Sequence, residues 1–143
     1  MTTFQASRDI PAPPNQVFAA FTEAQRLARW WGPAGFTNTF TLCEFKPGGR
    51  WSFVMHGPEG QHYPNEAIFA EIEPPTKVIV QHVSEPKFRL TITLAPAAGG
   101  TTVSWAQTFE SAEIASRIEQ IVVPANDQNL ERLSAEVLGK ANG

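Results

Sequence analysis

The sequence predicts an α+β domain in which a curved antiparallel sheet of about six strands and a long C-terminal helix enclose a cavity. Three observations support this fold class. Apolar residues recur at helical spacing near the two ends of the chain, they alternate with polar residues between those ends, and Gly and Pro residues separate the alternating segments. We expect one domain over residues 1–143, because no internal repeat or flexible linker divides them.

The amino-terminal part is predicted to form one strand followed by two short helices. Residues 4–10 have the pattern of a strand, and the prolines after them end it because proline cannot donate to a strand ladder. Apolar residues recur at helical spacing over residues 17–21. Thr22 and Gln25 have the spacing of a capping box, which predicts a second helix that ends near Trp31.

The middle of the chain is predicted to form a series of antiparallel strands. The segments are residues 39–45, 51–56, 62–73, 77–83, 87–94 and 102–109, with a bend in the third at Pro64. The clearest of them have one polar and one apolar face, as antiparallel strands covered on one side do. The apolar faces carry eight bulky side chains: Trp51, Phe53, Met55, Phe88, Leu90, Ile92, Trp105 and Phe109.

Two helical segments are predicted after the last strand. Ser111 can cap a helix over residues 112–123, because its side chain can accept a bond from a free amide of the first turn. Pro124 can open a final helix, since proline in a first turn loses no helical hydrogen bond. Apolar residues from Leu130 to Leu138 give this last helix a stripe that can cover the sheet.

A cavity is expected from the relative sizes of the sheet and the helix. A helix about 10 Å across is too narrow to cover six strands, so the twisted sheet must curl around it. Bulky rings that cannot interdigitate fully with one helix leave space between the two layers. The alternative is that the rings simply fill the interior.

Charge and composition exclude several classes of partner. The net charge is −3 and the 11 Lys and Arg residues are dispersed, which argues against a nucleic-acid partner. No apolar run approaches the roughly 20 residues that cross a bilayer. Cys43 has no second cysteine with which to form a disulfide, and the first residues lack the pattern of an export signal, so we expect the cytoplasm. A monomer and a homodimer both remain open.

Two blocks of short motifs carry a family resemblance. The first block contains Ile10-Pro11-Ala12-Pro13, Val17-Phe18, Trp30-Trp31-Gly32-Pro33 and Gly35-Phe36-Thr37. The second contains Pro47-Gly48-Gly49-Arg50-Trp51, Met55-His56-Gly57-Pro58, Tyr63-Pro64-Asn65 and Glu71-Ile72-Glu73-Pro74-Pro75. Together these motifs, which cover most of the first 83 residues, resemble the heat-shock-protein-90 ATPase activator homologue family.

This resemblance implies the START-like, helix-grip fold of the SRPBCC superfamily, in which a long C-terminal helix lies in a curved sheet over a ligand cavity. The implied layout agrees with the element order predicted from the residues. The superfamily includes lipid carriers, hormone receptors, polyketide cyclases and co-chaperone domains, so the fold does not fix the chemistry.

The candidate ligand-binding residues are those expected to face the cavity. They are Trp31, Phe36, Trp51, Phe53, Met55, Tyr63, Asn65, Phe69, Phe88, Leu90, Trp105, Gln107, Asn126 and Asn129. We expect one indole of the Trp30-Trp31 pair to anchor the core and the other to edge the cavity. An inward Gln107 needs a partner, which is a ligand, a buried water or backbone. Asn126 either faces the cavity or caps the final helix.

Other reactive residue types do not form a recognisable catalytic or metal-binding pattern. His56, His62 and His82 lack a third ligand at a typical spacing, so we expect no metal and no cofactor. Cys43 is interpreted as a small core residue. Glu66 and Glu71 are either surface carboxylates or, if buried, general bases.

Three functions are consistent with these residues. The first is non-enzymatic binding or transport of a small apolar or aromatic molecule in the cavity, in a stress-related setting. The second is a cyclase-like or hydrolase-like enzyme that uses Tyr63, Glu66 or His82 as an acid or base in the same cavity. The third is a module that binds a chaperone ATPase.

Overall fold

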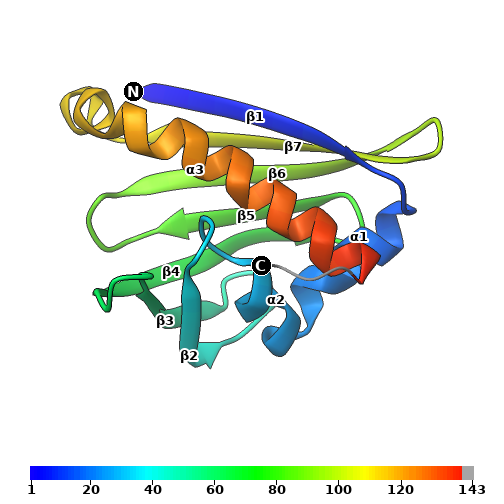
Figure 1. Ribbon diagram of the computed structural model, residues 1–143, viewed down its shortest axis with the longest axis horizontal. Helices are drawn as coiled ribbons and strands as arrows, with labels where there is room; N and C mark the ends of the chain where they lie inside the picture. The colour runs from blue at the N-terminus through cyan, green and yellow to red at the C-terminus, as the bar shows by residue number, and fades with distance from the viewer. Residues whose placement is uncertain (140–143) are drawn as a thin grey trace.

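The computed structural model describes residues 1–139, in which a seven-stranded antiparallel sheet curves around one long helix (Figure 1). The elements in chain order are β1 (Thr2–Ile10), α1 (Pro14–Thr22), α2 (Ala24–Trp30), β2 (Thr37–Cys43), β3 (Arg50–His56), β4 (His62–Glu73), β5 (Lys77–His82), β6 (Phe88–Ala97), β7 (Gly100–Phe109) and α3 (Ala112–Leu138). This confirms the α+β class, with one more strand in the sheet than the six expected.

The additional strand is β1, which pairs with β7, the last strand along the chain. The strand order is β1-β7-β6-β5-β4-β3-β2, so β2 to β7 follow one another as neighbours and β1 lies at the far edge beside β7. The antiparallel β1–β7 register runs from Thr2 opposite Phe109 to Ile10 opposite Thr101. Helices α1 and α2 carry the chain from one edge of the sheet to the other (Figure 1).

The predicted alternation places the apolar side chains on the inner face of the sheet. In β7 the residues Val103, Trp105, Gln107 and Phe109 are buried, and the alternate residues Ser104, Ala106 and Thr108 are more exposed. Pro64 pairs with Val54 within a continuous register, so no bulge interrupts β4 at this proline. The register of β4 instead shifts further along, between Phe69 and Glu71, and such a bulge bends a strand locally.

Helix α3 differs from the prediction, because it continues through Pro124 instead of starting there. Proline inside a helix forfeits one hydrogen bond and costs about 3 kcal/mol or more. Burial of a leucine contributes about 1.5–3 kcal/mol, and Leu130 and Leu133 are both buried against the core. Packing after the proline, together with buried Ala115 before it, therefore offsets the local cost. The predicted cap is confirmed, because the Ser111 hydroxyl accepts from the Ile114 amide at 3.2 Å.

The capping box predicted at Thr22 is wrong. Thr22 is the last residue of α1, and its hydroxyl donates to the Ala19 carbonyl at 3.2 Å. Threonine readily makes this local bond to a backbone carbonyl, which competes with capping. Glu23 therefore occupies the position before α2, without a side-chain cap. Within residues 1–139 no helix is both long enough and apolar enough to cross a bilayer.

Candidate ligand-binding site

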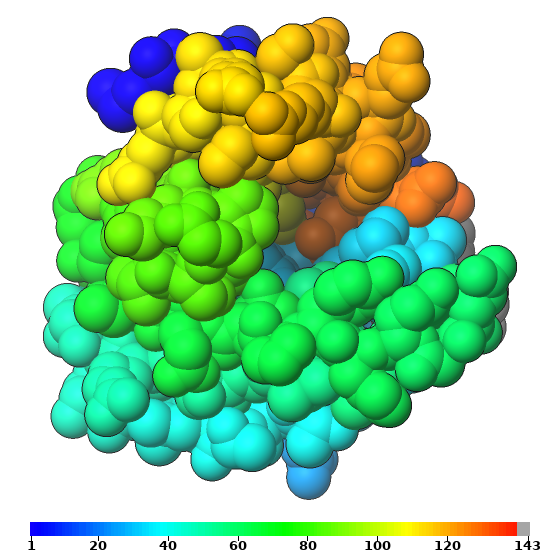
Figure 2. Space-filling model, turned by 90° about the vertical axis from the view of Figure 1, so that its left-hand side faces the viewer, coloured from blue at the N-terminus to red at the C-terminus, as the bar shows by residue number. Residues whose placement is uncertain are grey.

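A cavity of about 190 Å³ lies between α3 and the inner face of the sheet. Figure 2 shows a hollow between the yellow-to-orange first half of α3, the lime residues near the start of β6 and the green β4. Its lining is Trp31, Gly32, Pro33, Trp51, Phe53, Met55, Asn65, Ala67, Val80, His82, Pro86, Phe88, Leu90, Trp105, Gln107, Val122, Ala125, Asn126 and Asn129. The lining therefore combines five central strands, the segment after α2 and one face of α3.

Most of the candidate residues line this cavity, and three do not. Phe36, Tyr63 and Phe69 are absent from its lining. The Tyr63 side chain is 47% exposed, and its ring lies 6.1 Å from that of Phe36. Phe69 is buried behind the cavity wall, where its ring stacks on Trp51 at 5.1 Å. Alternation along β4 predicts the face of Tyr63 and Phe69 but not how far the cavity extends along that face.

Aromatic rings form much of the cavity wall. The Trp51 ring stacks on Phe53, with 4.4 Å between ring centroids, and forms a T-shaped pair with Trp31, with 4.8 Å between ring centroids. The indole N–H groups of Trp51 and Trp105 are buried without an acceptor among residues 1–139. A buried donor without a partner costs about 1–3 kcal/mol. Selection for stability alone does not explain two unpaired indole N–H groups in the cavity wall. Functional sites, in contrast, often include groups that lower the stability of the fold.

The two tryptophans at the end of α2 have different positions. Trp30 is fully buried, and its indole nitrogen donates to the Ala20 carbonyl at 2.9 Å. Trp31 lines the cavity and also contacts Trp105, with 5.8 Å between ring centroids. Trp30 therefore holds α2 against α1, and Trp31 contributes to the wall.

Two asparagines on α3 are buried and have different hydrogen-bond partners. Asn129 accepts from the Gly32 amide at 3.2 Å and donates to the Trp30 carbonyl at 2.9 Å. Asn126 donates to the Gln107 side-chain oxygen at 3.0 Å. Because Asn126 lies in the middle of a continuous helix, the interpretation of it as a cap is wrong. The partner of Gln107 is accordingly a side-chain amide, not backbone.

The segment after α2 is fastened to α3 by Arg132, whose guanidinium lies among backbone carbonyls. Its Nη1 donates to Pro33 at 2.8 Å and to Gly32 at 2.9 Å. The remaining carbonyl partners are Trp31 at 3.3 Å, Arg29 at 2.7 Å and Phe36 at 3.0 Å. Since no carboxylate pairs with it among residues 1–139, burial lowers the pKa of this guanidinium from its ordinary value.

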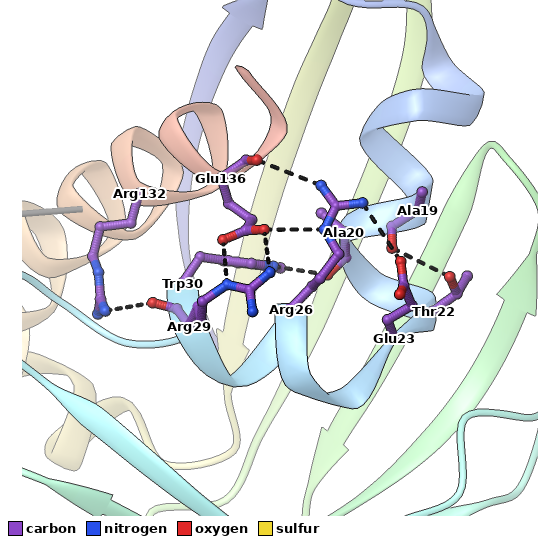
Figure 3. A network of polar contacts seen from close by, with 9 residues as sticks. All are labelled: Ala19, Ala20, Thr22, Glu23, Arg26, Arg29, Trp30, Arg132 and Glu136. Carbon is purple, nitrogen blue, oxygen red and sulfur yellow. Dashed lines mark hydrogen bonds and ion pairs between the residues drawn. The ribbon is translucent and has the colours of Figure 1, made fainter. Parts of the chain in front are cut away.

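Glu136, one turn after Arg132, binds α2 itself (Figure 3). Its carboxylate accepts from Arg29 Nε and Nη2, both at 2.9 Å, and from Arg26 Nε at 3.0 Å. Hydrogen bonding to Arg29 is the main reason why the pKa of Glu136 is lowered. Helices α2 and α3 are thus fixed to each other beside the cavity.

His82 is the only titratable residue in the lining formed by the described part of the chain. Its ring is 4% exposed and stacks on Phe88 at 4.5 Å. Its nitrogens lie 2.8 Å from the Pro86 carbonyl and 2.6 Å from Asn65 Oδ1, while Asn65 donates to the Tyr63 carbonyl. Burial lowers the pKa of His82, and the Pro86 carbonyl opposes that shift only in part.

The lowered pKa of His82 predicts a loss of stability in mild acid. As the pH falls through its ordinary value of about 6.5, the unfolded chain binds a proton that the folded chain still excludes. The free energy of unfolding should therefore fall by up to about 1.4 kcal/mol per pH unit below that point. Urea denaturation between pH 7.5 and 5.5 measures this fall, which should be smaller in His82→Gln. Identical pH profiles for the two proteins would show that His82 is not its source.

The other reactive side chains lie away from the cavity. His56 and His62 face each other across the β3–β4 hairpin with 2.7 Å between their Nδ1 atoms, and both are outside the lining. Glu66 is exposed and accepts from the Ser52 hydroxyl. Cys43 is half-buried, and burial raises the pKa of its thiol. Within residues 1–139 no group of three or more His, Cys, Asp and Glu residues could hold a metal ion.

Several lining residues were not among the candidate ligand-binding residues, although His82 was considered as an acid or base in the cavity. They are Gly32, Pro33, Ala67, Val80, His82, Pro86, Val122 and Ala125. Ala67 lies two positions after Asn65 on the same strand face, so alternation could have identified it. Ala125 precedes Asn129 at helical spacing within the predicted final helix, so that signal was visible in the sequence. Val122 precedes Asn126 at the same spacing, but this pair spans Pro124 and is visible only if the helix is continuous there.

Comparison with known proteins identifies the family. The family model of activator of Hsp90 ATPase homolog 1-like proteins matches residues 11–137. A solved structure from Arthrobacter aurescens has a TM-score of 0.88 and 26% identity, and covers 98% of this chain and 88% of that chain. One from Chromobacterium violaceum has a TM-score of 0.82 and 26% identity, and covers 94% of this chain and 96% of that chain.

The AHSA1 protein from Silicibacter pomeroyi has the same fold, with a TM-score of 0.76, 20% identity, and coverage of 96% of this chain and 98% of that chain. No curated protein matches the chain significantly. The resemblance predicted from the two motif blocks is confirmed, as is the START-like, helix-grip architecture. The chain belongs to the activator of Hsp90 ATPase homolog 1-like family.

Proposed function

We propose that this protein binds a small apolar or aromatic molecule in the cavity between α3 and the sheet, without transforming it. The observation that carries the proposal is a ring-lined cavity of about 190 Å³ that reaches the surface (Figure 2). An apolar cavity of about 150 Å³ is known to bind benzene. The volume therefore suits a molecule with one aromatic ring and small substituents.

The positions of the candidate acids and bases favour binding over catalysis. Tyr63 and Glu66 are exposed outside the lining. His82 lines the cavity, but its two nitrogens face the Pro86 carbonyl and Asn65. A general base needs a nitrogen that can reach the substrate. His82 nevertheless keeps the enzymatic alternative open, and turnover of a bound molecule that His82→Gln abolishes would support that alternative.

The family name makes a chaperone ATPase a third candidate partner. A pull-down at low salt, with the full chain as bait, tests this candidate directly. Capture of the chaperone by wild type and by a variant with a filled cavity alike would assign that role to another surface.

Filling the cavity is expected to abolish binding. Ala125 lines the cavity from α3, so Ala125→Phe places a ring in the space that the ligand needs. Titration of the wild type with toluene should give saturable changes in fluorescence, since Trp31, Trp51 and Trp105 line the site. Affinity should fall at least about tenfold in Ala125→Phe, which corresponds to 1.4 kcal/mol.

The matched control is Ala112→Phe, which makes the same change at the exposed start of α3. This variant should bind toluene as the wild type does. Absence of saturable binding in the wild type, or equal affinity in Ala125→Phe, would contradict the proposed function.

A further inference from the structure

The polar groups in the cavity lining differ in whether the protein already satisfies them. Asn129 bonds with both ends of its amide to backbone groups, the Trp30 carbonyl at the end of α2 and the Gly32 amide just after it. Asn65 and His82 contact each other, and their remaining polar atoms face backbone carbonyls. The indole N–H groups of Trp51 and Trp105 lack an acceptor but are fully occluded. Gln107 and Asn126 are different from all of these, because one bond joins them and each amide has a second polar end that is not fully occluded.

The free ends of this amide pair are the Gln107 amide nitrogen and Asn126 Oδ1. Neither has a hydrogen-bond partner among residues 1–139, and neither belongs to the fully occluded polar atoms that lack one. Both residues are only 8% exposed and both line the cavity, so the space that these atoms reach is the cavity. An amide nitrogen donates and a carbonyl oxygen accepts, so the pair presents one donor and one acceptor.

The site also discriminates by charge. The lining contributed by the described residues contains no Asp, Glu, Lys or Arg. Burial lowers the pKa of His82, so its ring is neutral at pH 7.5. A charged ligand would lose its hydration without meeting an opposite charge, which is costly.

We propose that the Gln107–Asn126 pair selects a neutral, single-ring aromatic molecule that carries a hydroxyl group, that is, a small phenol. One hydroxyl both donates to Asn126 Oδ1 and accepts from the Gln107 amide nitrogen, while the ring packs against the aromatic wall. This inference rests on the proposed function and names the class of ligand for the same cavity.

Four probes of similar size test this selectivity in the wild-type protein at pH 7.5. They are p-cresol, 4-methylanisole, toluene and 4-methylbenzoate, with dissociation constants measured by calorimetry. Two neutral hydrogen bonds at about 0.5–1.5 kcal/mol each predict that p-cresol binds about tenfold more tightly than toluene. 4-Methylanisole accepts but does not donate, so it should lie between them. 4-Methylbenzoate should bind most weakly.

Two nearly isosteric variants assign the preference to the amide pair. Gln107→Met and Asn126→Leu each remove polar groups and retain most of the volume. In each variant the ratio of toluene to p-cresol dissociation constants should fall to about threefold or less, with little change in the affinity for toluene. Gln5→Met is the matched control, because Gln5 is exposed on β1 and outside the lining.

The outcomes separate this inference from the proposed function. Equal affinity of the wild type for p-cresol and toluene overturns the phenol assignment and leaves the binding function intact. Failure of all four probes to bind saturably overturns both. A phenol preference that survives both substitutions overturns the role of the amide pair. Should either variant fail to fold, the order of affinities in the wild type alone decides between phenol and hydrocarbon.

Discussion

Replacing Arg132 with Met is expected to lower the free energy of unfolding by at least about 3 kcal/mol. The substitution keeps an apolar stem but removes every donor from a guanidinium that bonds to five backbone carbonyls between residues 29 and 36. Hydrogen bonds to a charged group contribute about 1.5–3 kcal/mol each, and the carbonyls that stay buried lose their partner. Trp31, Gly32 and Pro33 line the cavity, so ligand affinity should fall as well.

Urea denaturation of the wild type and Arg132→Met measures the loss, and Arg132→Lys tests the geometry. Lysine keeps the charge but lacks the planar fork, so we expect it to recover only part of the stability. Arg117→Met is the control, since Arg117 lies on the same helix in an exposed pair with Glu113, and exposed pairs contribute about 0–1 kcal/mol. A loss in Arg132→Met no greater than that of the control would refute the role given to Arg132.

Trp51→Ala is expected to cost about 3–5 kcal/mol and to remove one wall of the cavity. The side chain is 1% exposed, stacks on Phe53 and on Phe69, and forms a T-shaped pair with Trp31. Truncation leaves a void that these neighbouring rings cannot fill without moving. The variant should also bind toluene at least about tenfold more weakly, because contact with the wall is lost.

Thermal and urea denaturation measure the first effect, and calorimetric titration of folded protein measures the second. Tyr63→Ala supplies a matched comparison on the neighbouring strand. Tyr63 is 47% exposed, so we expect this substitution to cost less than about 1 kcal/mol. Comparable destabilisation by the two substitutions would be inconsistent with the packing described for Trp51.

The clearest strands could be predicted from the sequence because bulky apolar residues recur at every second position. The alternation from Trp51 to Met55 and from Phe88 to Leu94 predicted β3 and β6 and the faces that they bury. Pro124 and Thr22 were misinterpreted for different physical reasons. Packing of the flanking residues carries α3 through Pro124, whereas a local bond from the Thr22 hydroxyl to the Ala19 carbonyl replaces the predicted cap.

Part of the aromatic wall was also predictable, namely Trp31, Trp51, Phe53, Phe88 and Trp105. The different hydrogen-bonding roles of the polar residues were not. Asn126 and Asn129 have equivalent positions in the predicted helix. In the structure, however, Asn129 donates to the Trp30 carbonyl at the end of α2, and Asn126 donates to the Gln107 side chain. Arg132 gave no signal at all, because an arginine on a helix is usually solvated and its carbonyl partners are about 100 residues distant in the chain. Such roles depend on long-range contacts that local pattern does not contain.

The pairing of β1 with β7 has a consequence for how this chain folds. Strands β2 to β7 can assemble as successive hairpins between sequence neighbours. Pairing of β1 with β7 instead joins Thr2 to Phe109, which are far apart in the sequence. Closing so long a loop is entropically costly and slows folding. During synthesis β1 therefore has no strand to pair with until β7 has been made. We expect the pairing of β1 with β7 to be a late step in folding.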